Sequence, residues 1–149
     1  KNLVDGNVTE IGREGVLKVC PELSAIELPS GLLMRYDDLQ CNPVKVENER
    51  PEYTYKTRKG RTRIYGGKLI ENVCQAIARC IIAEQMLKIS KRYKVVLTVH
   101  DSVACCVPTE QGVEARAYME ECMRWLPTWA DGLPIDCESG TGLSYGDCE

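Results

Sequence analysis

The stretch that decides the fold class is KVVLTVHDSVACCV, residues 94–107. Its two apolar runs, Lys94–Val99 and Val103–Val107, are separated by only three polar residues, His100-Asp101-Ser102. Valine-rich runs that are joined by so short a connection are typical of an antiparallel β-hairpin. The pattern therefore predicts a hairpin that holds a carboxylate at the edge of a sheet, beside an apolar surface that excludes water.

The carboxylate of Asp101 has two interpretations. Aspartate is a favoured turn residue, so Asp101 can serve the turn alone. A rigidly held carboxylate can also help to fix a divalent cation, because Mg²⁺ is usually bound by one or two carboxylates together with substrate phosphates. A Ser/His/Asp hydrolase is not indicated, since three consecutive residues cannot form the relay.

A long helix is predicted before this hairpin, over residues 69–90. Its apolar residues recur at spacings of four, three and four, which is the pattern of one helix face and predicts that this face is buried. These residues are Ile70, Cys74, Ile77 and Ile81. A second face carries polar residues at the same spacing: Lys68, Asn72, Gln75 and Arg79. The four polar side chains form either an ordinary solvated face or a binding edge.

Two further hairpins are predicted before the helix. Residues 26–36 form two short strands around Pro29-Ser30-Gly31, where proline presets the turn and glycine accepts a positive φ. Residues 53–65 alternate around Arg58-Lys59-Gly60-Arg61, which gives the second hairpin a strongly basic tip. Between the hairpins, the polar residues 37–52 are predicted to form a surface loop.

After the 94–107 hairpin, a second helix is predicted from Thr109, as its N-cap, to Leu126. A short strand is predicted over residues 134–138. The order of these elements predicts an α+β fold, in which an antiparallel sheet with hairpins packs against two main helices.

Length and composition restrict the class of protein. A length of 149 residues favours a single domain over 1–149, with a β-rich part at 1–66 and the helices and the valine-rich hairpin at 67–149. The net charge of −3 argues against a protein whose whole surface binds nucleic acid, but allows a local basic strip. No apolar run approaches the ~18 residues of a membrane helix, and residues 1–6 have neither the apolar core of a signal peptide nor an initiator Met. We expect a cytoplasmic protein that is processed or part of something longer.

The nine cysteines do not form the pattern of a metal or disulfide module. Their number is odd, no C-x-x-C pair occurs, and His100 is the only histidine. Cys74 and Cys80 fall in the apolar helix pattern, and Cys105-Cys106 in an apolar strand. We expect these cysteines to be small buried side chains in a reducing compartment, with a small zinc or redox protein as the alternative.

Two segments together resemble the C-terminal part of family A (DNA polymerase I-like) DNA polymerases, and in particular their phage branch. The segments are GGKLIENVCQAIAR at residues 66–79 and LTVHD at residues 97–101. In addition, LPSG at residues 28–31, followed by Tyr36, is similar to the strand pair that these enzymes place before the helix. The resemblance covers about residues 15–145, most of this chain but only about the last third of a family polymerase unit.

The resemblance implies a fragment of the polymerase palm subdomain in which Val99-His100-Asp101 is motif C. Asp101 is then a ligand of the catalytic Mg²⁺ ions, and His100 lies beside the 3′ end of the primer. The implied reaction is template-directed transfer of a nucleotide from a dNTP to the primer 3′-hydroxyl. If a phage or prophage encodes the chain, its expected location is the cytoplasm of the host cell.

The resemblance also gives the polar helix edge a role on primer–template DNA. Asn72 and Gln75 are expected to meet base edges or sugars, whereas Lys68 and Arg79 lie nearer the phosphates. Minor-groove acceptors are shared among all base pairs, so amide and guanidinium donors suit an enzyme that must copy any sequence.

Two departures from the family pattern leave alternatives open. Ser102 stands where the family usually has glutamate, and single-subunit RNA polymerases often have His-Asp-Ser, so a palm fragment of such an enzyme is one alternative. Motif A and the fingers helix are not visible, although a two-metal transfer needs a second carboxylate. The spare carboxylates Asp37, Asp38 and Asp136 lack the family's surrounding pattern.

The missing motifs lead to three expectations about the isolated chain. It should be nearly inactive alone, it should pair with the remaining N-terminal polymerase portion, and its open strand edges should favour a homo-oligomer. A non-catalytic module that binds nucleic acid is the second alternative.

Overall fold

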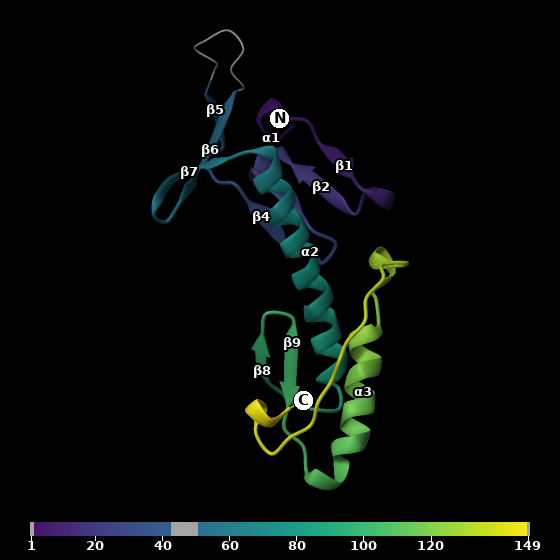
Figure 1. Cartoon of the computed structure of the whole chain (residues 1–149). Helices are drawn as coiled ribbons and strands as arrows, with labels where there is room; N and C mark the ends of the chain where they lie inside the picture. Colours follow the sequence, from purple (N-terminus) through teal and green to yellow (C-terminus); the bar gives the residue numbers. More distant parts are fainter. Residues whose placement is uncertain (1, 43–50, 149) are drawn as a thin grey trace. The chain divides into compact units, whose positions relative to one another are not determined.

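The computed structural model describes residues 2–42 and 51–148, which fall into two units, residues 1–77 and 78–149 (Figure 1). The boundary between the units lies within helix α2 (Gly66–Ile89). The α+β class predicted from the sequence is confirmed, with the antiparallel strands divided among three sheets. Among the described residues, no helix is long and apolar enough to cross a bilayer.

The first unit is built mainly from two antiparallel sheets. The first sheet has the order β1 (Thr9–Ile11), β2 (Leu17–Cys20), β3 (Ala25–Glu27), β4 (Leu33–Arg35), preceded by the short helix α1 (Asn2–Asp5). The hairpin predicted around Pro29-Ser30-Gly31 is confirmed as β3 and β4, and Gly31 has a φ of +80°, as its turn requires. Side chains of β2 and β3 form the core of this sheet: Leu17, Val19, Cys20, Ala25 and Ile26 are all buried.

The second sheet of this unit has the order β5 (Gln40–Asn42), β6 (Glu52–Thr57), β7 (Gly60–Ile64). The predicted basic hairpin is confirmed as β6 and β7, joined by Arg58-Lys59. The prediction that residues 37–52 form only a loop is wrong at β5, which pairs with β6 through Cys41 opposite Tyr53. Its backbone partners lie ten to fourteen residues away in sequence, so local composition does not reveal the strand. Residues 43–50 of the predicted loop lie outside the described residues.

Helix α2 is confirmed, but it begins at Gly66 and its buried face differs from the predicted one. Ile70 is 65% exposed and Cys74 is exposed, which corrects the expectation that both are in the core. The buried residues are Cys80, Ile81, Gln85 and Ile89, all in the second half of the helix. Periodicity identifies a helix face, but the neighbouring elements decide which turns of that face are covered.

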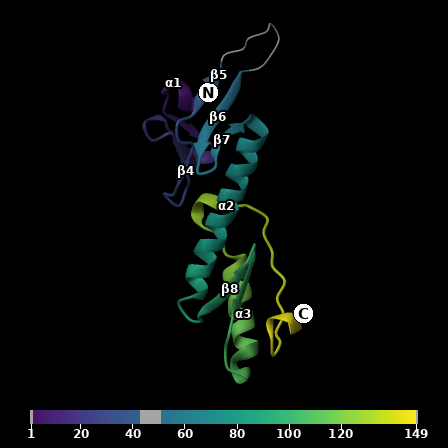
Figure 2. The ribbon, with the colours of Figure 1, turned by 90° about the vertical axis from the view of Figure 1, so that its left-hand side faces the viewer.

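The second unit contains the end of α2, the hairpin of β8 (Val95–Val99) and β9 (Ser102–Cys105), and helix α3 (Gly112–Arg124) (Figures 1 and 2). Its core cluster consists of Ile89, Tyr93, Ala115 and Cys122, with residues of both strands packed around it. Two side chains, Gln85 and Tyr118, form part-buried hydrogen bonds between α2 and the region of α3. Gln85 Nε2 donates to the carbonyl oxygens of Met123 and Trp125 at 2.6 and 3.0 Å, and the Tyr118 hydroxyl donates to the Lys88 carbonyl oxygen at 3.0 Å.

Two predictions about the C-terminal region are wrong. Thr109 makes no capping hydrogen bond, because it opens a short 3₁₀ turn and α3 begins three residues later, at Gly112. Residues 134–138 form no strand. With no neighbouring strand to pair with, this segment is held instead by the side chain of Arg124, which donates to Asp136 Oδ1 at 2.7 Å and to the Cys137 carbonyl oxygen at 3.1 Å.

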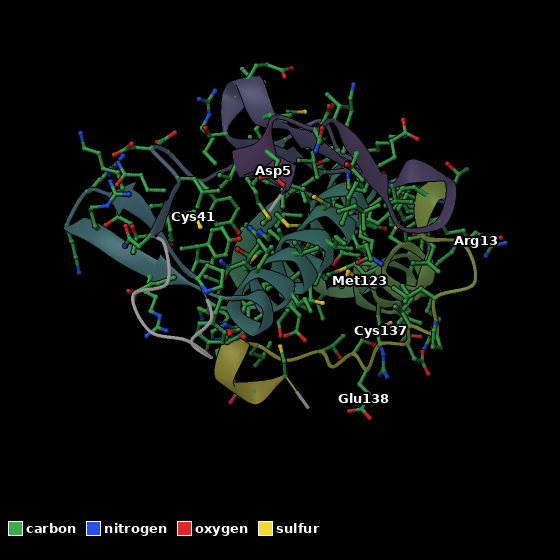
Figure 3. The ribbon with its side chains drawn as sticks, turned by 90° about the horizontal axis from the view of Figure 1, so that it is seen from above. Asp5, Arg13, Cys41, Met123, Cys137 and Glu138 are labelled. Carbon is green, nitrogen blue, oxygen red and sulfur yellow. The ribbon has the colours of Figure 1, made fainter. Side chains whose placement is uncertain are left out.

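Glu120 on α3 also holds this C-terminal segment. It accepts hydrogen bonds from Ser139, Arg124 and Arg116. These bonds favour the charged form and lower the pKa of Glu120 to about 2. The carboxylate of Glu138, by contrast, points away from the ribbon (Figure 3).

Candidate functional site

The valine-rich hairpin is closed by a two-residue turn. Val99 pairs with Ser102, so His100 and Asp101 alone form the connection between β8 and β9. Ser102 is therefore the first residue of β9 rather than part of the turn. The turn has a positive φ of +54° at His100 and not at Asp101. A two-residue turn with a positive φ at its first position normally carries glycine there.

The backbone conformation of His100 is costly for a residue with a side chain. The left-handed region costs an L-residue roughly 1–2 kcal/mol, because its Cβ approaches the following carbonyl oxygen. His100 is exposed, and its imidazole makes no hydrogen bond or ion pair with the described part of the chain. The histidine thus brings no contact to the fold that offsets this cost, which favours a functional reason for its side chain.

Replacing His100 by glycine should stabilise the fold. We expect His100→Gly to raise the free energy of unfolding by about 0.5–1 kcal/mol, because relief of the strain exceeds the extra entropy of the unfolded glycine. His100→Ala is the matched control, since alanine also lacks the imidazole but keeps the strain. Urea denaturation of the three chains measures the difference. A glycine variant that is less stable than the alanine variant would contradict the assigned backbone conformation.

Asp101 is exposed, and its carboxylate has no hydrogen bond or ion pair with the residues that the structure describes. The strand before it is less buried than the sequence predicts: Val96, Leu97 and Val99 are 49, 41 and 40% exposed. An unpaired carboxylate beside apolar side chains is free to accept a cation.

The described residues do not supply a complete two-magnesium site. Within the described ranges, no three His, Cys, Asp or Glu residues are grouped so that they could hold a metal ion. Asp101 fits as one ligand, and a second carboxylate is lacking. The spare carboxylates do not supply it, because Asp38 pairs with Arg61 at 2.5 Å and Asp136 with Arg124 at 2.7 Å. Asp37 belongs to no such group among the described residues either.

The four polar residues of the predicted binding edge all lie on α2. Three are in the first unit. Lys68 Nζ lies 3.0 Å from Glu71 Oε1, and this ion pair raises the pKa of Lys68. Gln75 Nε2 donates to the same Glu71 oxygen at 3.3 Å. Arg79, in the second unit, is exposed and makes no ion pair with described residues.

Asn72 takes part in an arrangement that sequence patterns do not reveal. Its Nδ2 donates to the hydroxyl of Tyr36 at 3.3 Å, and the Tyr36 ring packs edge-on against Tyr55 with 5.2 Å between centroids. Burial raises the pKa of Tyr36. These residues line a shallow, open depression in the first unit together with Met34, Arg35, Gln75 and Ala76. The contact joins residues 36 positions apart, and no local periodicity links them.

The cysteines are only partly buried. Cys80 is buried as expected, but Cys105 is only half-buried and Cys74 and Cys106 are exposed, which corrects the expectation for these three. Cys20 and Cys122 are also buried. Cys74 lies in the first half of α2, where no residue of the helix is buried, and Cys106 follows the last residue of β9. All nine are free thiols.

The comparison with curated proteins points to one class, the DNA polymerases. Over 122 residues, the chain is 33% identical to the DNA polymerase of Bacillus phage SP02. The matched region is 76% of this chain and 18% of that polymerase, so the chain spans less than a fifth of its relative's length. No family model and no solved structure matches the chain.

Proposed function

We propose that the chain is the C-terminal palm portion of a family A DNA polymerase of the phage type. The observation that carries the proposal is the unpaired Asp101 carboxylate, held on a strained two-residue turn in a chain similar to a phage DNA polymerase. In this proposal the turn is motif C. The complete enzyme attaches a nucleotide from a dNTP to the 3′-hydroxyl of a primer paired with its template.

In the complete enzyme, Mg²⁺ neutralises the charge that develops on the transferred phosphoryl group. The negatively charged Asp101 carboxylate would be one of the ligands of the metal site. His100 presents its imidazole to the end of the primer, which explains a histidine at a position whose backbone prefers glycine. The other metal ligands belong to the remaining polymerase portion, because the described residues of this chain supply one suitable carboxylate.

The polar face of α2 is proposed to carry primer–template DNA. A side-chain amide has two N–H donors, and Asn72 and Gln75 each use one within the chain. The other donor of each remains for the acceptors of the minor groove, which all base pairs share. Lys68 and Arg79 contact phosphates, which position the duplex without reading its sequence.

The remaining polymerase portion is also the proposed partner of the valine-rich hairpin. β8 and β9 form a sheet of only two strands, so each has an open edge. The half-exposed Val96, Leu97 and Val99 add an apolar surface to β8. A two-stranded sheet is marginal by itself, and open edges with apolar side chains favour pairing with further strands. In isolation, the same surface favours a homo-oligomer.

A complementation assay tests the proposed function. The isolated chain should not extend a primed template with Mg²⁺ and dNTPs, because its described residues supply only one carboxylate suited to the metal site. Addition of the separately purified N-terminal portion should restore extension, and a chain with Asp101→Asn should not restore it. Robust extension by the isolated chain would rule out the fragment proposal, since a complete metal site would then lie within the chain.

A further inference from the structure

The hairpin of β6 and β7 carries an unusual concentration of positive charge. Five cationic side chains fall within eight positions, and no carboxylate lies between them: Lys56, Arg58, Lys59, Arg61 and Arg63. The whole chain, in contrast, has a net charge of −3. A local basic surface on an acidic chain creates a positive potential that attracts polyanions.

The strand register places the strand cations on one face of the hairpin. Lys56 is paired with Arg61 and Thr54 with Arg63, and paired residues of antiparallel strands point to the same side. The other face carries Tyr55, which packs against Tyr36, and Ile64, which is buried. The core side and the cationic side are therefore separated, and the cations remain exposed. Nitrogen-ended side chains project outward from the strands beside Cys41 (Figure 3).

Internal contacts use only part of this charge. Arg61 is committed to the fold, since it donates to Asp38 and to the Thr54 carbonyl oxygen. Arg63 lies 3.1 Å from Glu52 in an exposed ion pair, which holds the two side chains only weakly. Lys56, Arg58 and Lys59 make no ion pair with any residue that the structure describes. Among the described residues, three cations are thus without an ion-pair partner, and Lys56 interacts with Asp38 only over a longer distance.

The tip that carries two of these cations is well ordered. Thr57 Oγ1 donates to the Gly60 carbonyl oxygen at 2.8 Å and accepts from the Lys59 amide at 3.3 Å. Gly60 has a φ of +121°, which a residue with a side chain rarely adopts. The turn therefore presents Arg58 and Lys59 from a defined backbone, which lowers the entropy lost when they bind.

We propose that the β6–β7 hairpin is a phosphate-binding arm that contacts the backbone of duplex DNA without reading its sequence. The proposal rests on the proposed polymerase function for its choice of polyanion. The exposed face offers cations and threonine, and it has no apolar anchor of the kind that dominates protein–protein interfaces. Duplex DNA supplies the matching dense and regular negative charge.

Fluorescence anisotropy of the full 149-residue chain with a labelled duplex, over a series of salt concentrations, tests the proposal. The hairpin variant is Lys56→Gln/Arg58→Gln/Lys59→Gln. We expect about tenfold weaker binding at 50 mM salt and a salt slope of log K that is smaller by about 2–3, because each lost phosphate contact removes about 0.9. The loss should be equal for A·T-rich and G·C-rich duplexes.

Two further variants separate the hairpin from net charge. Arg13→Gln/Lys91→Gln/Lys94→Gln removes the same charge at exposed positions outside the hairpin, of which Arg13 projects outward in Figure 3. It should keep the wild-type slope. The variant Lys56→Arg/Arg58→Lys/Lys59→Arg keeps the charge of the hairpin. Its salt slope should therefore also equal that of the wild type. Three results would each overturn the inference. The hairpin and control variants could lose the same affinity, the hairpin variant could bind as the wild type does, or the wild-type chain could fail to bind duplex DNA.

Failure of the polymerase proposal has a different signature. If the chain binds duplex DNA through the hairpin but does not restore extension in the complementation assay, the polymerase proposal is ruled out and the phosphate-binding arm stands. If the chain restores extension but the hairpin variant binds duplex DNA as the wild type does, the phosphate-binding arm is ruled out and the polymerase proposal stands.

Discussion

Asp101→Asn should reduce the primer-extension rate of the complete polymerase by roughly 10³-fold or more, about 4 kcal/mol of transition-state stabilisation. Asparagine keeps the size of the side chain and is as well suited to a turn, but it lacks the charge that holds Mg²⁺. Folding should be almost unaffected, because the exposed carboxylate makes no contact with the described residues. Extension rate and urea denaturation, measured on the same variant, separate catalysis from stability.

Gln75→Ala is the paired control for this experiment. It removes an amide donor from the proposed duplex-binding face, so primer–template affinity should fall while the metal site stays intact. The Asp101→Asn variant should show the reverse, with duplex affinity retained. If Asp101→Asn keeps more than about a tenth of the wild-type rate, a loss of less than ~1.4 kcal/mol, Asp101 serves the turn and the motif C assignment is wrong.

Ile89→Ala should have the largest effect on stability, with a loss of about 2–4 kcal/mol in the free energy of unfolding. Ile89, the last residue of α2, is completely buried in the core cluster of the second unit, which also contains residues of α3. Truncation removes its apolar contacts and leaves a cavity among Tyr93, Ala115 and Cys122. Chemical denaturation of the wild-type and variant chains measures the loss.

Ile70→Ala is the matched control on the same helix. Ile70 is 65% exposed, so the same truncation should change the free energy of unfolding by less than about 0.5 kcal/mol. Alanine also has the higher helix propensity, which offsets part of any lost contact. Equal losses at Ile70 and Ile89 would contradict the burial pattern of α2.

Local signals in the amino-acid sequence are sufficient to predict several of the secondary elements. The turn residues Pro29-Ser30-Gly31, the basic tip at Arg58-Lys59 and the polar interruption at His100-Asp101 each predicted a hairpin, and all three are present. The helix over residues 69–90 was equally evident from its 3.6-residue period. These features depend on φ preferences and side-chain alternation over a few residues, which the sequence expresses directly.

The same local signals were misleading where a distant partner decides the outcome. The strand predicted over residues 134–138 does not form, because strand structure needs a neighbour and the segment binds Arg124 instead. β5 forms inside a predicted loop, because β6 lies beside it. A strand has no hydrogen bonds of its own, so its existence is a property of the sheet and not of the segment.

Which candidate residues are free to act depends on contacts that form in the folded chain. Asp38, Asp101 and Asp136 are equivalent as carboxylates in the sequence. In the fold, Asp38 and Asp136 each form an ion pair with an arginine, whereas the Asp101 carboxylate makes no hydrogen bond or ion pair with the described residues. In the same way, the sequence placed polar residues on one edge of α2, and the fold joined Asn72 to Tyr36. Residue type and spacing determine what chemistry a side chain can perform. The pairing of charges and donors across the fold determines which side chains remain available, because each such contact joins residues that are distant in the sequence.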